Sequence, residues 1–544
     1  MNRFTPHRYR AGRLTTAFLM GVLMALSVGP AAAQMQQALA ETTTEPLTLT
    51  LDEAIQIALV NNYAIRNNRL DVDNAQAQIR EAWSDVMPQV DVSSSYTRNL
   101  KTANPFAGSE AGNIFSTLGF VGWLSFNEDA RGDGDPVTIP ITFDEYQDRL
   151  FEGLDQAGVV RGNDNNPFGV ENQFQSGINI TQTLFSGSAL AAITGAKRLK
   201  LAFQRGVDRQ EQLLIDQVRQ SFYQTLLAQE QAKVSVQSVA RTRRTRNETA
   251  RRVSQGVAPK FQRLSAEVQL ANLETQLVQI QNQSASALDN LKFTLGIPIE
   301  QPVQLRGALE ADDYNPYRMI SVQDAFSLAV ERRPDLEQAH LNIELRKIDK
   351  NISRSDYLPH LSTFANFSYI GSVPDSRTFT TSDSDDPFSF SVGENDFFSS
   401  SYWQPSVNVG FRMTWNLFNG FRTSAQVQQR QIAVERAKIE LTQLQQSVRL
   451  EVETALRNLE TAQQRIRSQQ KNVVNAELNY TYASTRLHEG VATPLEERDA
   501  SDQLDQSRLN YLQAVHDYLV ARSAFETAMG MPLGQQTDLK LTSR

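Results

Sequence analysis

The sequence contains no cysteine and only five scattered histidines. The absence of cysteine excludes disulfides, thiol chemistry and the lipid anchor that a lipoprotein carries on its first mature residue. The histidines show no metal-ligand spacing, and the nucleophile elbow, the P-loop and the HExxH motif are all missing. We therefore predict no catalytic residue, no cofactor, no metal site and no enzyme activity.

Charge of one sign is also scarce, since the net charge is −8 over 544 residues. Such a mild imbalance gives no reason to expect a nucleic-acid partner. One acidic stretch, with Asp129, Asp133 and Asp135, is similar to a calcium loop but lacks its regular ligand spacing. We interpret it as a solvated loop.

A short apolar run, Ala17–Val28, follows a basic start at the N-terminus, and small residues follow it at 31–33 and again at 38–40. This pattern predicts a signal peptide over residues 1–33, with cleavage as late as residue 40 as an option. An uncleaved anchor is the alternative, but a membrane-spanning helix needs about 20 apolar residues. We expect an exported chain that cannot enter a membrane by apolar helices.

The sequence does contain an internal duplication. Landmarks of the first half return in the second at a shift of 271 residues near the start and of 233 residues further on. The smaller shift places an insertion of about 38 residues in a loop of the first copy, between Pro88 and Leu184. We predict two structural repeats, 47–300 and 318–535, and a C-terminal tail at 536–544. The early landmarks are Ala54, Ala58, Ser84 and Pro88, which return as Ala325, Ala329, Ser355 and Pro359.

Each repeat opens with a helical pattern and changes to strand-like alternation after Pro88 or Pro359. The clearest alternation runs from Val407 to Leu417, where apolar and polar residues take opposite faces. We predict strands at about 89–98 and 174–185 in the first repeat and at about 360–370 and 404–418 in the second. Long polar loops, 99–172 and 371–403, join the strands of each pair.

A soluble, half-buried sheet would show the same alternation and is the alternative to a membrane sheet. Strand lengths near those of membrane barrels, aromatic residues near strand ends and long polar loops favour the membrane. Four strands cannot close a barrel, and open sheet edges are not tolerated in lipid. The chain is therefore expected to oligomerise in contact with outer-membrane lipid. The aromatic residues are Tyr96, Tyr369, Trp403 and Trp415.

Each second strand leads into a very long helical segment that reverses once. The run from Val434 to Val473 keeps apolar residues at steps of three, four or seven, which is a heptad-like seam among polar residues. A helix of about 65 residues is about 100 Å long, and a seam this narrow does not suit a membrane span. We predict two soluble helical hairpins, 189–295 and 423–529, with tips near Gly256 and Gly490.

Several motifs recur in both copies in the same order: Leu51–Ala54 with its second-copy partner, the strand-ending Leu184–Gly187 and Leu417–Gly420, and the tips Gln255–Ala258 and Glu489–Ala492. With them the mature chain resembles the TolC family of outer-membrane efflux proteins, the outer membrane factors. The resemblance implies a homotrimer in which four strands per chain build a twelve-stranded β-barrel, continued by a twelve-helix periplasmic tunnel. The expected fold is thus an α+β membrane protein. The implied partners are a periplasmic adaptor (a membrane fusion protein) and an inner-membrane pump of the RND, ABC or MFS type.

Two acids follow the second tip, and they are the candidate pore residues. Glu496 and Asp499 are three residues apart and share one helix face. In a symmetric trimer this face would form an acidic ring that favours cations, and the resemblance implies such acids at the tunnel constriction. The alternative is that acids in a first helical turn complement the macrodipole. In the first copy, Gln262 and Ser265 occupy the matching positions.

The resemblance also assigns adaptor docking to the two tips, for which plain helix reversal is the alternative. The residues concerned are Gln255, Gly256, Val257 and Ala258 in the first copy and Glu489, Gly490, Val491 and Ala492 in the second. Family members often lock the closed tip with a Tyr and an Arg at the positions that Leu487 and Ala492 occupy in this chain. A closed state must use other contacts, and the candidates are Arg486, His488, Glu497 and Arg498.

The function predicted from these features is that of an outer-membrane exit duct in a tripartite efflux or type I secretion system. The alternative is a periplasmic coiled-coil adaptor or scaffold without a channel, which would have one hairpin and small β domains. An exported enzyme would need a catalytic constellation that the sequence lacks. Neither the substrate nor the class of pump is evident from the sequence.

Overall fold

The computed structural model describes residues 46–102, 110–132, 134, 139–159, 170–310, 317, 320–383 and 386–531. The expected signal peptide, the tail at 536–544, and Asp133 and Asp135 lie outside these residues. The chain forms two compact units. Unit 1 takes the residues up to Arg69, then Gly206–Asp335, and those from Leu444 onward, and unit 2 takes Leu70–Arg205 and Leu336–Gln443.

In unit 1, local capping sets the start of each repeat. The Thr50 hydroxyl accepts a hydrogen bond from the Glu53 backbone N–H, and the Glu53 carboxylate accepts one from the Thr50 N–H at 2.8 Å, so α1 (Leu51–Asn61) begins with a capping box. Ser321 accepts from the Asp324 N–H at 3.1 Å and starts α7 (Val322–Arg332) in the same way. The duplication is thus visible in the caps. Two short strands, β1 (Leu47–Leu49) and β4 (Val303–Leu305), pair in parallel in this unit.

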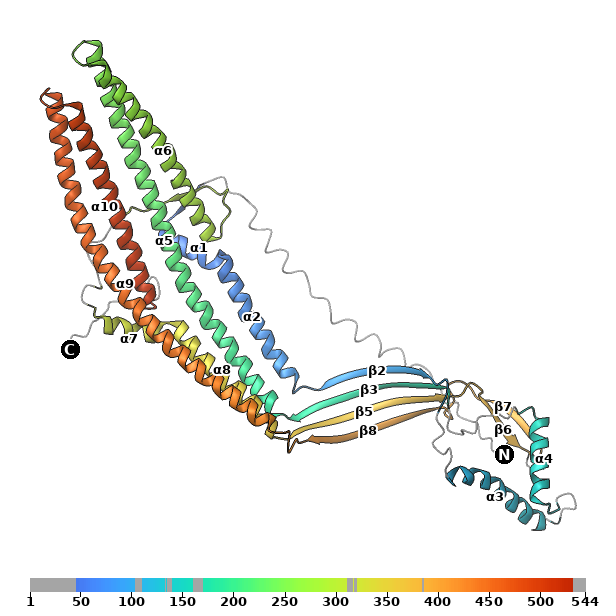
Figure 1. The fold of residues 1–544 in the computed structure, drawn as a ribbon. Coiled ribbons are helices and arrows are strands. Elements are labelled where there is room, and N and C mark those ends of the chain that lie inside the picture. The colour runs from blue at the N-terminus through green and yellow to red at the C-terminus, as the bar shows by residue number, and fades with distance from the viewer. Residues whose placement is uncertain are drawn as a thin grey trace, which may run out of the picture. The chain divides into compact units, whose positions relative to one another are not determined.

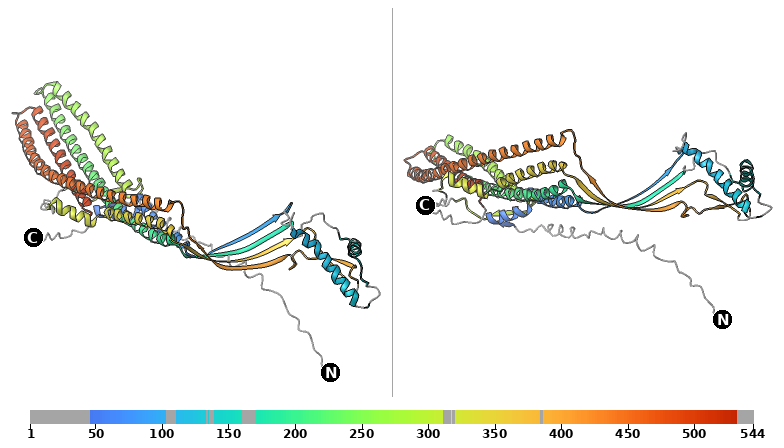
Figure 2. Two further views of the ribbon diagram at one scale, coloured as in Figure 1. Left: turned by 60° about the horizontal axis from the view of Figure 1, so that its bottom comes forward. Right: turned by 90° about the horizontal axis from the view of Figure 1, so that it is seen from below.

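Two helical hairpins dominate the chain, and the core of unit 1 lies between their helices and α1. The helices of each hairpin run side by side (Figure 1), as two further views confirm (Figure 2). Leu214, Val218, Phe222 and Leu226 recur every fourth residue on one helix, are all buried, and pack in one cluster with residues of the return helix and of α1. The hairpin helices are α5 (Gly187–Ser254), α6 (Lys260–Leu295), α9 (Arg422–His488) and α10 (Pro494–Ala528).

Unit 2 contains one antiparallel four-stranded sheet with the order β2–β3–β5–β8 (Figure 1). The two strands of each repeat are neighbours, and β3 pairs with β5 to join the copies. The edge strands β2 and β8 each pair with a single strand of the described chain. The strands are β2 (Gln89–Arg98), β3 (Asn172–Phe185), β5 (His360–Val373) and β8 (Trp403–Thr414).

The sheet has one apolar face and one polar face. Four apolar side chains pair in register across all four strands and are all exposed: Val92, Ile178, Phe367 and Val407. The next row is small or polar: Ser93, Gly177, Ser368 and Ser406. Because successive residues of a strand point to opposite faces, these rows lie on different sides of the sheet. The alternation predicted from the sequence is therefore real, and its apolar side is uncovered within the described chain.

The segments expected as polar loops contain secondary structure. The first holds α3 (Glu110–Gly132) and α4 (Phe143–Gln156), and the second holds the hairpin of β6 (Thr378–Ser382) and β7 (Phe390–Glu394). Phe126, Tyr146 and Phe388 form a cluster of aromatic rings that joins the two loops, with centroids 5.2 to 5.6 Å apart. The sequence does contain a dense apolar run within α3, from Ile114 to Phe126, which the prediction of one continuous polar loop overlooked. Asp129 lies in α3, and no group of three or more potential metal ligands occurs among the described residues.

The predicted strand at 404–418 was too long at its C-terminal end. Hydrogen bonding in β8 stops at Thr414, and Trp415 and Leu417 are exposed beyond it. Gly420 and Phe421 then take positive φ angles and turn the chain into α9. Helices α2 (Tyr63–Ser84) and α8 (Pro334–Arg354), with the short η2 (Ser355–Tyr357), precede β2 and β5. Among the helices described, none carries an apolar stretch long enough to cross a membrane.

Candidate functional site

The two hairpin tips, both in unit 1, turn on a glycine. Gly256 has φ 74° and Gly490 has φ 80°, a left-handed conformation that side chains with a Cβ rarely adopt. Behind each glycine a backbone bond closes the helix end, from the Val257 N–H to the Arg252 carbonyl at 3.0 Å and from the Val491 N–H to the Arg486 carbonyl at 2.9 Å. These are Schellman-type ends. The sequence placed both reversals correctly.

The return helices start differently at the two tips. The Thr493 hydroxyl accepts from the Glu496 backbone N–H at 3.3 Å, and the Glu496 carboxylate accepts from the Thr493 backbone N–H and hydroxyl at 3.4 and 3.1 Å. With Pro494 at the first helical position, α10 has a complete capping box. In contrast, the cap position of α6 is Pro259, which offers no side-chain hydrogen bond. The second tip is therefore held by more local bonds.

Both candidate pore acids are exposed and each has an arginine neighbour. The Glu496 carboxylate lies 3.8 Å from the Arg486 guanidinium, and the Asp499 carboxylate lies 3.1 Å from that of Arg498. Exposed pairs of this kind stabilise a protein by about 0 to 1 kcal/mol. The structure thus gives Glu496 a definite local role as a helix cap, and leaves Asp499 with a weak pair on the surface.

Of the four candidates for an alternative lock, Arg486, Glu497 and Arg498 make contacts in this region. The side chain of His488 is exposed and forms no hydrogen bond or ion pair with the described residues. Leu487 is only 8% exposed, so this position is used for apolar packing. Val257 and Val491, at the outer ends of the tips, are 70% and 65% exposed.

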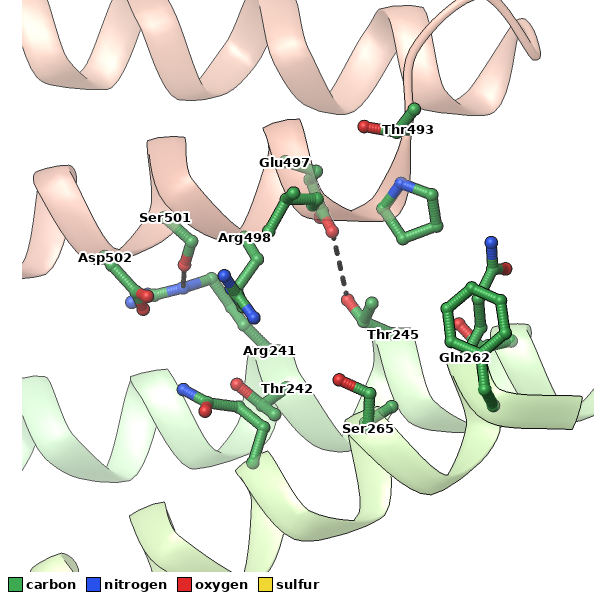
Figure 3. A pocket seen from close by; sticks show the side chains of 16 residues that line it. Arg241, Thr242, Thr245, Gln262, Ser265, Thr493, Glu497, Arg498, Ser501 and Asp502 are labelled. Atoms are coloured by element: carbon green, nitrogen blue, oxygen red, sulfur yellow. Dashed lines mark hydrogen bonds between the residues drawn. The ribbon is translucent and has the colours of Figure 1, made fainter. Parts of the chain in front are cut away.

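Thr245 and Arg241 of α5 connect the hairpins near their tips, and neither belongs to the predicted pore or docking set. Figure 3 shows the hydrogen bonds of Thr245 with Glu497 and of Arg241 with Ser501. The Thr245 hydroxyl of α5 donates to the Glu497 carboxylate of α10 at 3.3 Å. Further from the tips, Arg241 forms an ion pair with Asp505, and its Nε donates to the Ser501 hydroxyl at 3.3 Å. Sequence reasoning missed Thr245, Arg241 and Asp505.

A signal for the ion pair between Arg241 and Asp505 was present in the sequence. Arg241 lies fifteen residues before Gly256, and Asp505 lies fifteen residues after Gly490. Equal distances from two tips bring residues to the same level when hairpins pack side by side, and opposite charges at one level favour pairing. The pairing of α5 with α10 was the missing information.

A cleft of about 390 Å³ opens between α5, α6 and α10 at this level. Glu497 lines it and is only 9% exposed. Burial raises the pKa of the Glu497 carboxyl above its ordinary value, and the hydrogen bond from Thr245 opposes this shift. Asp502, further along α10, also has its pKa raised by burial. The acids of the second tip therefore form two groups: Glu496 and Asp499 are exposed, whereas Glu497 and Asp502 line the cleft.

Comparisons with known proteins agree with the predicted family. A family profile described as outer membrane efflux protein matches residues 158–297 and 325–531. The outer membrane efflux protein BepC of Brucella suis biovar 1 (strain 1330) is 26% identical over 136 residues, a match that covers 25% of this chain and 30% of BepC. The chain therefore aligns with less than a third of that relative's length.

Solved structures share the fold over most of the chain. A crystal structure of CusC, in a study of its folding and transmembrane channel formation, has a TM-score of 0.63 at 18% identity and covers 89% of this chain and 92% of that one. The Campylobacter jejuni CmeC outer membrane channel has a TM-score of 0.63 at 15% identity and covers 88% and 85%. At such low identity these similarities establish the fold alone.

Proposed function

This chain belongs to the outer membrane efflux protein family, and on that premise we propose that it is the outer-membrane exit duct of a tripartite efflux or type I secretion system. It is an outer-membrane transport protein and not an enzyme. The observation that carries the proposal is the four-stranded sheet with an exposed apolar row on one face and a polar row on the other. A sheet of this kind suits lipid on one side and an aqueous lumen on the other.

The proposed assembly is a homotrimer. Strands β2 and β8 end the sheet on either side, and an open edge in lipid leaves backbone N–H and C=O groups without partners. Pairing β2 of one copy with β8 of the next removes both edges. Three copies would supply twelve strands, as the family resemblance implies.

The hairpin tips are proposed to face a periplasmic adaptor, with the inner-membrane pump of RND, ABC or MFS type beyond it. The residues proposed for docking are Gln255, Gly256, Val257, Ala258, Glu489, Gly490, Val491 and Ala492. Val257 and Val491 support this, because each tip exposes an apolar side chain at its outermost turn. Both drug efflux and protein secretion fit the same arrangement.

Glu496 and Asp499 are proposed to line the constriction of the duct. Both are exposed on one face of α10, while Gln262 and Ser265 hold the matching positions after the first tip. The capping box supports a second role for Glu496, that of starting α10. A test must therefore separate charge from capping.

Conductance of the purified protein in a planar bilayer tests both proposals. Glu496→Gln/Asp499→Asn removes two charges per chain and keeps a capping side chain at position 496, since Gln also serves in a capping box. We expect the channel to open and its cation preference to fall. The matched control is Glu267→Gln/Glu274→Gln on α6, which removes the same charge from exposed ion pairs. Absence of any channel in the wild type would refute the exit duct, whereas an unchanged cation preference in the double variant would refute only the acidic constriction.

A further inference from the structure

The cleft between the hairpins has the size and the mixed lining of a small-molecule site. Its volume of about 390 Å³ falls in the range of ligand pockets, roughly 300 to 1,000 Å³. Phe261 and Leu495 supply an apolar wall and are 67% and 54% exposed. Hydroxyl groups of Thr245 and Ser265 face the same space (Figure 3).

Within this cleft Glu497 is a buried acid without a cationic partner. Its one hydrogen bond is the 3.3 Å contact from the Thr245 hydroxyl, and no described Lys, Arg or His lies within ion-pair distance of it. Asp505, whose side chain is 14% exposed, has Arg241 as its partner. A buried carboxyl normally pairs with a cation or becomes protonated and neutral. A bound ligand can therefore supply the cation that the protein does not place beside Glu497.

The other charges around Glu497 are already engaged or acidic. From α5 the neighbours are Arg241, which is bound to Asp505, and Glu248; from α10 they are Arg498, which pairs with Asp499, and Asp502. Helix α9 contributes the Tyr480 phenol, whose pKa is raised by burial and by the Glu497 charge. Helix α6 contributes only uncharged side chains to the cleft. The unpaired charge that faces the cleft is therefore negative.

The geometry points to a binding site for a small organic cation, a protonated amine on an aromatic or aliphatic body. The ammonium group donates to the Glu497 carboxylate, and the Thr245 and Ser265 hydroxyls accept its remaining protons. The body of the ligand packs on Leu495 and on the Phe261 ring, whose face also attracts a cation. This site is separate from the proposed constriction at Glu496 and Asp499, and its occupancy does not depend on whether the chain conducts ions.

Equilibrium binding of 2-phenylethylamine to the purified full-length protein tests the inference. The neutral isostere 2-phenylethanol and the anion phenylacetate serve as competing probes. We expect the amine to bind in preference to both. Glu497→Gln keeps the side-chain shape and should weaken amine binding roughly tenfold or more, because a charge-assisted hydrogen bond is lost. Glu460→Gln on the exposed side of α9 removes the same charge and should leave amine binding unchanged. Detergent takes up the same amount of probe in every sample, so the affinity of each variant is compared with that of the wild type in the same detergent.

A second variant separates the site from its charge. Ser265→Trp fills the cleft from α6 without a charge change and should abolish amine binding, while Glu497→Gln should leave weak binding that no longer distinguishes the amine from the alcohol. Amine binding should also strengthen as the pH rises through the pKa of Glu497. Equal affinity for the amine and the alcohol in the wild type, tighter binding of phenylacetate, or full amine binding in either variant would overturn the inference.

Discussion

Arg241 on α5 and Asp505 on α10 form a part-buried ion pair that joins the two helical hairpins at equal distances from their tips. The side chains are 13% and 14% exposed, and the Asp505 Oδ2 atom has no hydrogen-bond partner. Arg241 also lies over the Tyr480 ring of α9, with its guanidinium carbon 6.0 Å from the ring centroid. One arginine thus connects three helices, which sets the level at which the hairpins pack.

Removing the cation of this pair should be costly. Arg241→Met leaves the part-buried Asp505 without its cation, so we expect a loss of about 3 kcal/mol in the free energy of unfolding, the lower end of the range for a buried pair. Thermal unfolding of the purified protein measures it. Arg243→Met is the control, because its pair with Glu274 is exposed and should contribute less than about 1 kcal/mol. The double change Arg241→Met/Asp505→Leu should recover most of the loss; if it does not, the cost comes from packing and not from the orphaned charge.

The tip glycines should resist substitution for conformational reasons alone. A Cβ added at Gly256 or Gly490 meets nothing within 4 Å, yet both residues have positive φ. We expect Gly256→Ala and Gly490→Ala each to cost about 1 to 2 kcal/mol, the penalty for a left-handed L-residue, and Gly490→Asn to cost less. Gly119→Ala in α3 has equal space and no positive φ, and should be neutral or stabilising. Denaturation midpoints of the four variants compare them, and equal costs for Ala at Gly119 and Gly490 would contradict the explanation.

Glu497 should make the stability of the hairpin tips depend on pH. Burial raises the pKa of its carboxyl, so the folded protein holds this proton more tightly than the unfolded chain, whose ordinary value is 4.5. The stability that the group contributes is therefore present below that value and is lost as the pH rises through the raised folded-state pKa. Glu497→Gln should flatten the fall in melting temperature as the pH rises above 4.5, and should raise the melting temperature at the higher pH, where the wild-type carboxyl has lost its proton. Parallel pH profiles for the variant and the wild type would show that Glu497 does not titrate in this way; Glu460→Gln controls for net charge.

The C-terminal end of α10 should depend on Arg333, which shares this helix end with Arg209. The Arg333 guanidinium donates to the Asp335 carboxylate at 2.7 and 3.1 Å, to Glu451 at 2.7 Å and to the Ala528 carbonyl at 3.2 Å. A lysine cannot reproduce this fork of donors, so Arg333→Lys should cost about 2 kcal/mol or more despite conserving the charge. The matched change Arg346→Lys, in an exposed pair with Asp349, should have little effect. Equal melting temperatures for the two variants would contradict the role of the network.

Much of the fold was predictable because it depends on local and periodic signals. Thr50 with Glu53 and Ser321 with Asp324 start their helices through neighbours three residues away, and Gly256 and Gly490 end theirs through backbone conformation. Strand alternation gave the two faces of the sheet. The errors lie in two places: β8 ends at Thr414 although the alternation continues to Leu417, and helices α3 and α4 occupy a segment expected to be a loop.

The candidate site was predictable only in part. The acids Glu496 and Asp499 were found because they lie on one helix close to a recognisable tip. Thr245 and Arg241 were missed because their partners are more than 250 residues away in the chain, at Glu497 and Asp505. Charge and hydroxyl groups at such separations carry no signal until the packing of α5 against α10 is known.

The sequence by itself determined the duplication, the order of helices and strands, the tip glycines and the family, because these follow from motifs and short-range periodicity. Tertiary structure alone decided which acids are exposed and which are buried. Glu496 and Glu497 are adjacent in the chain, yet the first caps α10 at the surface and the second faces the cleft between the hairpins. The reason is that successive residues of a helix point in directions about 100° apart. Only the packing of the other hairpin against α10 buries the side of the helix on which Glu497 lies.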